Sequence, residues 1–161
     1  MKIEVPPDKA DTVYSVIAQR RTAFDTLIWQ VPSLGLAAQA FLLTIAFGAG
    51  TSDVARCIAG ALSSVVALVA IQTMLKHRLN EITDSIILRE MELDLGIGIG
   101  KGTAPHDPPL DRARASGNPR AEDFPTKWRS VTLWIVSLLC FATAGVVAIV
   151  LTLAGSNALS G

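Results

Sequence analysis

The stretch LIWQVPSLGLAAQAFLLTIAFGAG (Leu27–Gly50) decides the fold, because it carries no charged residue over a length that matches a lipid bilayer. A helix rising about 1.5 Å per residue needs about 20 apolar residues to cross a hydrocarbon core of about 30 Å. Two further runs, Val54–Leu75 and Val131–Gly155, are of similar length. The chain is 50% hydrophobic and only 17% charged, with a mean hydropathy of +0.44. We therefore expect an all-α integral membrane protein with transmembrane helices at 27–50, 54–75 and 131–155.

The distribution of charge predicts the orientation. Of the 14 Lys and Arg residues, four precede the first run, nine lie between the second and third runs, and Arg56 is next to the turn between the first two. Cytoplasmic loops are enriched in Lys and Arg, which predicts an inner-membrane protein with a cytoplasmic N-terminus and an external tail at 156–161. Acidic residues follow the same division, so the unbalanced basic footprint of a nucleic-acid-binding protein is missing from the sequence and we predict no nucleic-acid partner.

The remaining segments are predicted from their patterns. Residues 1–26 are expected to form a cytoplasmic amphipathic helix, with a kink or break at Pro32. A short turn at Gly50–Asp53 would make the first two spans an antiparallel hairpin. The second span continues as a cytoplasmic helical stalk at 76–95, because apolar residues keep a helical spacing beyond the membrane edge. Glycines and prolines predict a flexible linker over 96–128.

The apolar face of the predicted stalk would need a partner. Its members recur at helical spacing: Leu79, Ile82, Ile86 and Leu93. The partner could be the N-terminal helix, a second copy of the chain or a cytoplasmic protein that binds the 76–95 helix. Because the spans are also rich in small residues, we expect a homo-oligomer in the lipid bilayer.

Polar residues at matching distances from the turn are predicted to meet across the hairpin. Gln39 should bond Ser64 near mid-depth, since an unpaired amide in hydrocarbon is costly. An Asp25–Arg78 ion pair is expected at the cytoplasmic mouth, and Arg21 is expected near Glu81. These contacts could hold the helices together or could line a polar path through the membrane.

One cluster has the spacing of a metal site. His77, Glu81 and Asp84 follow one another at i, i+4 and i+7, so an imidazole and two carboxylates could converge on a divalent cation. A charged, solvated helix surface has the same pattern, and no cofactor is predicted. The glycine-rich stretch at 96–103 lacks the spacing of a phosphate-binding Walker A loop.

Two stretches carry a resemblance. RRTAFDTLIWQVPSLGLAAQAF (Arg20–Phe41) and MLKHRLNEITD (Met74–Asp84) resemble small, uncharacterised bacterial membrane proteins. The layout of about residues 10–95 is also similar to the SLATT group of two-span effectors, in which cytoplasmic helices flank a membrane hairpin. That resemblance implies a role in defence through membrane damage and transfers no functional residue to this chain. The third span is additional to the two-span plan.

Three functional hypotheses follow from these observations. The first, which we favour, is a non-enzymatic oligomeric membrane module that acts as a scaffold or forms a pore. The second is a channel or transporter subunit with a path lined by Gln and Ser. The third is a metal-dependent membrane enzyme that uses the His77, Glu81 and Asp84 cluster.

Overall fold

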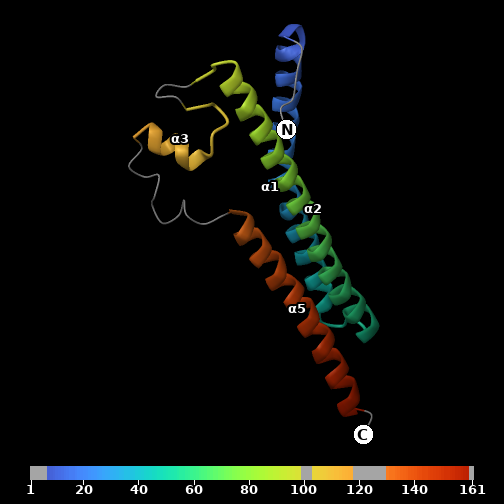
Figure 1. The fold of residues 1–161 in the computed structure, drawn as a ribbon. Helices are drawn as coiled ribbons and strands as arrows, with labels where there is room; N and C mark the ends of the chain where they lie inside the picture. Colours follow the sequence, from blue (N-terminus) through green and yellow to red (C-terminus); the bar gives the residue numbers. More distant parts are fainter. Residues whose placement is uncertain (1–6, 99–102, 118–129, 160–161) are drawn as a thin grey trace. The chain divides into compact units, whose positions relative to one another are not determined.

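The computed structural model describes residues 7–98, 103–117 and 130–159, and the regular secondary structure of these residues is entirely helical. A short 3₁₀ helix, η1 (Pro7–Lys9), precedes the long helix α1 (Ala10–Ala46). Helix α2 (Asp53–Asp94) follows, then the short α3 (Pro109–Ala115) and finally α5 (Ser130–Leu159), as Figure 1 shows. Helix α2 confirms the prediction that one helix extends from near Val54 to near Leu95.

Helix α1 continues through Pro32 without the break that the sequence suggested as one alternative. Proline at this position removes the N–H that would bond the carbonyl of Ile28. The hydroxyl of Ser33 donates to the neighbouring carbonyl of Trp29 at 2.7 Å, so a side chain adds a bond beside the gap. Pro32 itself is buried, and its packing helps to keep the helix continuous.

A tight turn joins α1 to α2. The amide of Gly48 donates to the carbonyl of Ile45, and the amide of Thr51 donates to the carbonyl of Gly48. Gly50 has φ +80°, a left-handed conformation that glycine adopts without strain. The guanidinium of Arg56 reaches back to the carbonyl of Gly48 at 3.2 Å. The turn is therefore short, and hydrogen bonds to its own carbonyl groups stabilise it.

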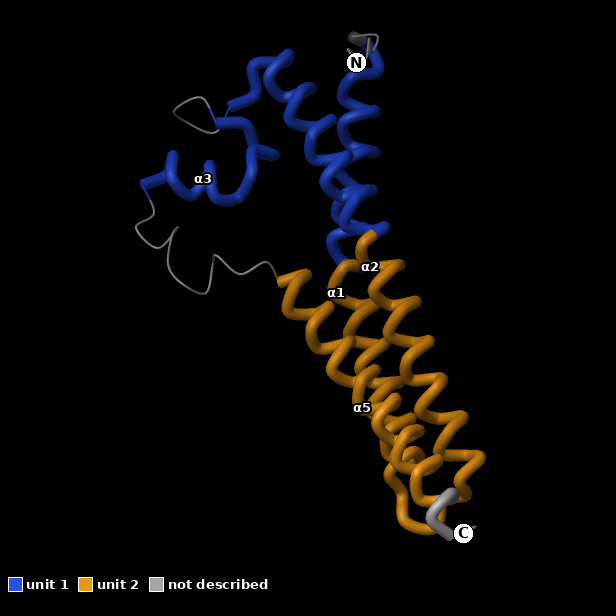
Figure 2. Tube along the Cα trace, turned by 60° about the horizontal axis from the view of Figure 1, so that its bottom comes forward, with its two compact units in different colours: residues 1–27, 76–128 blue, residues 28–75, 129–161 orange. Residues whose placement is uncertain are grey.

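The chain divides into two compact units, drawn in two colours in Figure 2. Unit 1 comprises residues 1–27 and 76–128, and unit 2 comprises residues 28–75 and 129–161. Helices α1 and α2 each contribute to both units, whereas α3 belongs to unit 1 and α5 to unit 2. The division falls next to the predicted ends of the first two apolar runs.

Unit 2 is held together by small residues from α1, α2 and α5. Gly60 and Gly145 bring the backbones of α2 and α5 so close that a Cβ on Gly60 would lie 2.5 Å from the Gly145 carbonyl oxygen. Two buried clusters flank this contact, one of Ala46, Ala59 and Ala148 and one of Ala67, Ala70 and Leu138. Such close approach is the usual basis of helix association in lipid, where large apolar side chains gain nothing from burial against one another.

Ile28, Met74 and Leu138 are buried, but many other large apolar side chains of unit 2 point outward. Phe41 is 66% exposed, Leu68 64% and Leu151 62%. Three helices, α1, α2 and Ser130–Gly155 within α5, are long and apolar enough to cross a membrane. An interior of small residues and a surface of large apolar ones fit a hydrocarbon environment better than water.

The predicted linker differs from a flexible tether in the part that the structure describes. Residues 103–117, called the connecting segment below, contain α3 and a turn in which the amide of Asp107 donates to the carbonyl of Ala104. Ala104 is 1% exposed. Pro109 at the start of α3 suits a first helical turn, where its missing N–H costs nothing. The prolines here thus mark the start of a helix, and contacts with residues distant in sequence hold the connecting segment in place.

Candidate functional site

The interior of unit 1 is lined with acidic side chains of α2. Glu81 is 4% exposed, Asp84 2% and Glu92 0%. They lie on one face of the helix because their spacing follows the helical repeat. A buried carboxylate is costly unless it is paired, so each of these three side chains requires a hydrogen-bond or ion-pair partner.

Arg20 of α1 pairs with Asp84 through two bonds. Its Nε lies 2.8 Å from Oδ2 and its Nη2 lies 2.5 Å from Oδ1. This parallel fork is the strong geometry of a guanidinium with a carboxylate. The Arg20 side chain stays half-exposed while Asp84 is buried, so the long side chain reaches inward from the surface.

A second acidic residue, Glu81, holds two arginines. Arg21 Nη2 lies 2.9 Å from Glu81 Oε1, and Arg78 Nη1 lies 2.5 Å from Oε2. Arg21 Nε also donates to Ser85 Oγ at 2.6 Å, and Ser85 donates to Glu81 at 3.1 Å. One carboxylate thus connects α1 to α2 and shares its charge between two cations.

Glu92 is the third buried carboxylate, and it attaches the connecting segment to α2. Tyr14 of α1 donates its hydroxyl to Glu92 Oε1 at 2.7 Å, and the backbone N–H of His106 donates to Oε2 at 2.9 Å. The His106 ring also bonds Glu92 through Nδ1, and the Tyr14 and His106 rings meet edge to face at 6.2 Å. Burial works against the charged form, but the bonds from Tyr14 and His106 outweigh it and lower the pKa of Glu92. The same burial, with the bond to Glu92, raises the pKa of Tyr14 to about 12.

Asp107 provides a further attachment of the connecting segment to α2. Arg89 Nε bonds Asp107 Oδ1, and the backbone N–H of Ala104 donates to Oδ2 at 2.8 Å. The bond from Arg89 is the main reason that the pKa of Asp107 is lowered. Arg112 of α3 donates to the carbonyl of Pro105 at 2.9 Å. Opposite charges on α2 and the segment therefore position the start of α3.

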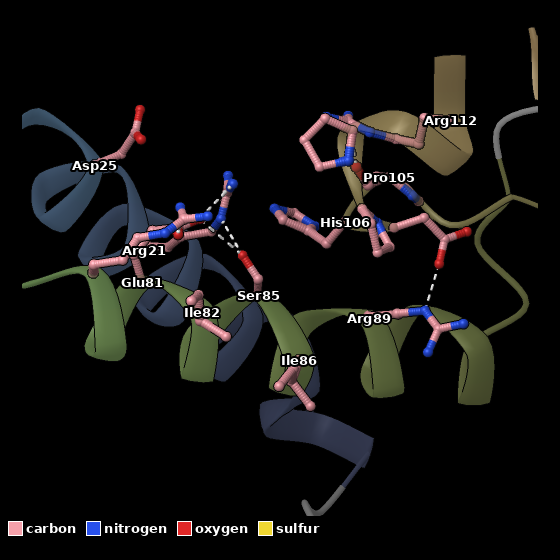
Figure 3. A pocket seen from close by; sticks show the side chains of 14 residues that line it. Arg21, Asp25, Glu81, Ile82, Ser85, Ile86, Arg89, Pro105, His106 and Arg112 are labelled. Atoms are coloured by element: carbon pink, nitrogen blue, oxygen red, sulfur yellow. Dashed lines mark hydrogen bonds and ion pairs between the residues drawn. The ribbon is translucent and has the colours of Figure 1, made fainter. Parts of the chain in front are cut away.

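Unit 1 contains a partly open pocket of about 350 Å³ beside these contacts. In Figure 3, Arg21 and Arg112 lie at opposite ends of the view, with His106 and Pro105 between them. Basic side chains come from all three parts of the unit, and Ile82, Ile86 and three prolines supply apolar wall. The full lining is Arg21, Asp25, Arg78, Glu81, Ile82, Ser85, Ile86, Arg89, Pro105, His106, Asp107, Pro108, Pro109 and Arg112.

The predicted Gln39–Ser64 bond is replaced by contacts with backbone. Gln39 is fully buried in unit 2, and its Nε2 donates to the carbonyls of Ser63 at 3.1 Å and Leu138 at 3.2 Å. Ser64 donates to the carbonyls of Gly60 and Ala142, at 3.3 and 3.4 Å. The prediction failed because it considered two helices, whereas α5 supplies acceptors to both side chains.

The two predicted contacts near the predicted cytoplasmic mouth have different outcomes. Arg21 and Glu81 form an ion pair. Among the described residues, the predicted ion pair between Asp25 and Arg78 does not form, although both line the pocket. Arg78 instead bonds Glu81, three residues along the same helix, which is the nearer carboxylate on its own face.

The candidate metal ligands have separate partners. Glu81 bonds Arg21 and Arg78, Asp84 bonds Arg20, and the His77 ring lies 5.8 Å from the ring of Phe24. Within residues 7–98, 103–117 and 130–159, no three His, Cys, Asp or Glu side chains are grouped as a metal ion requires. Helical spacing put these side chains on one face, but the arginines of α1 engage the carboxylates from the other side.

Sequence reasoning missed five residues that attach the connecting segment, namely Tyr14, Arg89, Glu92, His106 and Asp107. It also missed Ser85, which bonds Arg21 and Glu81, and Arg112, which bonds a carbonyl within the segment. One signal was present for the Arg20–Asp84 pair, since Arg20 falls on the apolar face of its helix and must therefore reach either water or an acid. Glu92 falls on the buried face of α2 and gives the matching signal from the other helix. His106 lies in a proline-rich segment with no periodicity, so no local pattern could have identified it. No family model, curated protein or solved structure matches this chain.

Proposed function

We propose that this chain is a non-enzymatic inner-membrane module whose three spans anchor a cytoplasmic helical unit, and that copies associate through that unit. Helices α1, α2 and α5 would cross the bilayer, with α1 and α2 as an antiparallel hairpin extended into the cytoplasm by unit 1. The N-terminus and the connecting segment would then share the cytoplasmic side.

Association is supported by an apolar face of α2 that is left uncovered in unit 1. Helix α1 packs on the acidic face, where Glu81, Asp84 and Glu92 are buried. Leu88 is buried with the acidic face, but four other apolar residues of the same helix stay outside, with exposed fractions between 40% at Ile82 and 64% at Leu79. We call Leu79, Ile82, Ile86 and Leu93 the apolar stripe. A row of exposed apolar side chains outside the membrane favours a protein partner.

A second copy is the partner we favour. The stripe residues are separated by three, four and seven residues, which is the repeat of helices that pair along a seam. A membrane anchor would hold all copies in one orientation and confine them to two dimensions. Parallel alignment of identical helices would therefore cost less entropy than association from free solution.

The interior of unit 2 favours a scaffold or a multi-copy pore over a path through one chain. Gly60 and Gly145 meet backbone to backbone, and the amide of Gln39 is directed at two carbonyls. Gln39 and Ser63 are both fully buried. A pore would need several copies around a shared opening.

Association can be tested with the full chain in lipid nanodiscs and detergent. Leu79→Glu places a charge on the stripe outside the pocket lining, and we expect it to convert oligomers to monomers in light-scattering measurements. Asn80→Glu is the matched control, because Asn80 follows Leu79 in the same helix but lies about 100° around its axis, away from the stripe. A wild-type chain that stays monomeric at every concentration would contradict the proposal. Capture of a different protein by monomers would instead identify the stripe as a heterologous site.

Liposome leakage separates the two forms of the proposal. Ion leakage that Leu79→Glu abolishes would support a pore, and assembly without leakage would support a scaffold.

Orientation is tested with single cysteines at Ser52 and Ser116 in a chain lacking Cys57 and Cys140. An impermeant reagent should label position 52 in intact cells and spare position 116. The reverse pattern would invert the topology.

A further inference from the structure

The charges around the pocket of unit 1 leave an excess of positive charge. Four arginines line it against three carboxylates, before any proton on His106 is counted. Glu81 is shared by Arg21 and Arg78, so it offsets only one of them. Arg112 donates to a neutral carbonyl, that of Pro105. The pocket therefore attracts anions more strongly than cations.

The guanidinium groups retain donors for a ligand. Each arginine has three nitrogens that carry N–H groups in a planar fork. The bonds described above use Nε and Nη2 of Arg21, and a single nitrogen in each of Arg78, Arg89 and Arg112. Arginine forks match the oxygens of phosphate and bind them in pairs. Arginines from α1, α2 and α3 thus line one pocket from three parts of the chain.

The size of the pocket and its apolar wall restrict the ligand further. A volume of about 350 Å³ lies at the lower end of the range for small-molecule sites. Ile82, Ile86 and the prolines of the connecting segment add apolar surface beside the basic groups. A ligand that fills this space has an anionic head and a less polar remainder, whereas inorganic phosphate alone would leave much of it empty.

We propose that this pocket binds a phosphate-bearing ligand, either the head group of an anionic phospholipid or a soluble phosphate ester. In the proposed topology, Arg78 follows the second apolar run by three residues, which is about 5 Å along a helix. Arg21 precedes the first run by six residues. The end of the pocket formed by Arg21 and Arg78 would then lie near the level of lipid head groups, where basic side chains meet anionic lipids. Arg89, at the other end, follows the second run by 14 residues, which is about 21 Å along a helix.

Asp25 provides a test that distinguishes an anion from a cation. It lines the pocket, and no ion pair of Asp25 occurs in the described part of the chain. Its carboxylate repels an anionic ligand and attracts a cationic one. Asp25→Asn should therefore tighten the binding of an anion, a gain that a misfolded variant would not show.

The soluble arm of the experiment uses the full chain in phosphatidylcholine nanodiscs, titrated with pyrophosphate in a calorimeter at low salt. Arg112→Gln should weaken binding by about tenfold, as expected for the loss of a charged hydrogen bond. Arg114→Gln is the matched control, because it removes the same charge from the same short helix outside the lining. It should change the affinity less than about twofold. Asp25→Asn should raise the affinity by a few-fold.

The lipid arm repeats the titration in nanodiscs made of equal parts phosphatidylcholine and phosphatidic acid. If a lipid head group occupies the pocket, pyrophosphate binding will fall in these discs, and bound phosphatidic acid will be lost from Arg112→Gln in native mass spectrometry. Binding of pyrophosphate that is equal in both discs would identify a soluble ligand. No binding in either arm, equal effects of Arg112→Gln and Arg114→Gln, or weaker binding by Asp25→Asn would overturn the proposal. Ile82 and Ile86 belong both to the apolar stripe and to the pocket lining. Each titration is therefore repeated with the Leu79→Glu chain, in which association through the stripe is blocked, so that a failure of binding is distinguished from a failure of association.

Discussion

Glu92 is the residue whose replacement should have the most informative effect on unit 1. Glu92→Gln keeps the volume of the side chain but replaces one acceptor oxygen with an NH₂ group. In the structure, Oε1 accepts from Tyr14 and His106, and Oε2 accepts from the His106 amide. If the new NH₂ faces the His106 backbone N–H, a donor meets a donor and that bond is lost. If it faces Tyr14 and the His106 ring, both groups must change from donor to acceptor, and in either orientation the remaining bonds lose the charge of the carboxylate.

The size of this effect follows from the number of bonds. A hydrogen bond to a charged group contributes about 1.5–3 kcal/mol, a neutral one about 0.5–1.5, and a buried group left without a partner costs about 1–3 kcal/mol. Together these values predict that the connecting segment is held less tightly by about 2–4 kcal/mol. The equilibrium for its detachment should then rise by about 30- to 1,000-fold.

Hydrogen exchange in nanodiscs measures this detachment directly. Peptides covering Ala104–Asp107 should exchange faster in Glu92→Gln, because the His106 and Ala104 amides lose protection when the segment opens. Glu90→Gln is the control, since Glu90 is exposed on the same helix two residues away. Equal exchange rates in wild type, Glu92→Gln and Glu90→Gln would refute the structural role assigned to Glu92.

The same contact predicts how attachment depends on acid. The folded state lowers the pKa of Glu92 below its ordinary value of 4.5, so the carboxylate binds a proton less readily when the segment is attached. Its contribution is therefore complete above pH 4.5 and is lost as the pH falls through the lowered pKa. Exchange of the His106 amide, corrected for its intrinsic pH dependence, should accelerate over this acid range in wild type and stay level in Glu92→Gln.

Three further variants test the remaining contacts. Tyr14 has a pKa raised from 10.0 to about 12, so its hydrogen bond to Glu92 should stabilise unit 1 below pH 10, and this stabilisation should be lost between pH 10 and about 12. Tyr14→Phe should remove this alkaline loss of exchange protection. Gly60→Val should destabilise unit 2 by about 1–3 kcal/mol or more in denaturant unfolding, since the new side chain would meet backbone, whereas Gly155→Val has open space and should be nearly neutral. Gln39→Leu should cost about 1–2 kcal/mol in the same assay, because two carbonyls lose their donor, while the exposed Gln30→Leu should not. Stability that is equal within either pair would contradict the packing described for unit 2.

Local patterns in the sequence were enough to predict the helices. Apolar runs of bilayer length identified the three long helices, and the continued spacing of Leu79, Ile82 and Ile86 predicted that α2 extends past its apolar run. These predictions succeed because helix formation and hydropathy are properties of neighbouring residues. The Arg21–Glu81 ion pair was also predictable, since both residues lie at similar distances from a short turn.

The partners of the buried groups required the tertiary structure. Gln39 bonds a carbonyl of α5, which lies 99 residues away in sequence. Glu92 receives donors from Tyr14 and His106, at separations of 78 and 14 residues. A side chain reveals by its type that it needs a partner, but the choice among distant donors depends on how the helices pack. Membrane-length helices were thus determined by sequence alone, whereas the arginine-lined pocket arose only when α1, α2 and the connecting segment came together, because each of them contributes part of its wall.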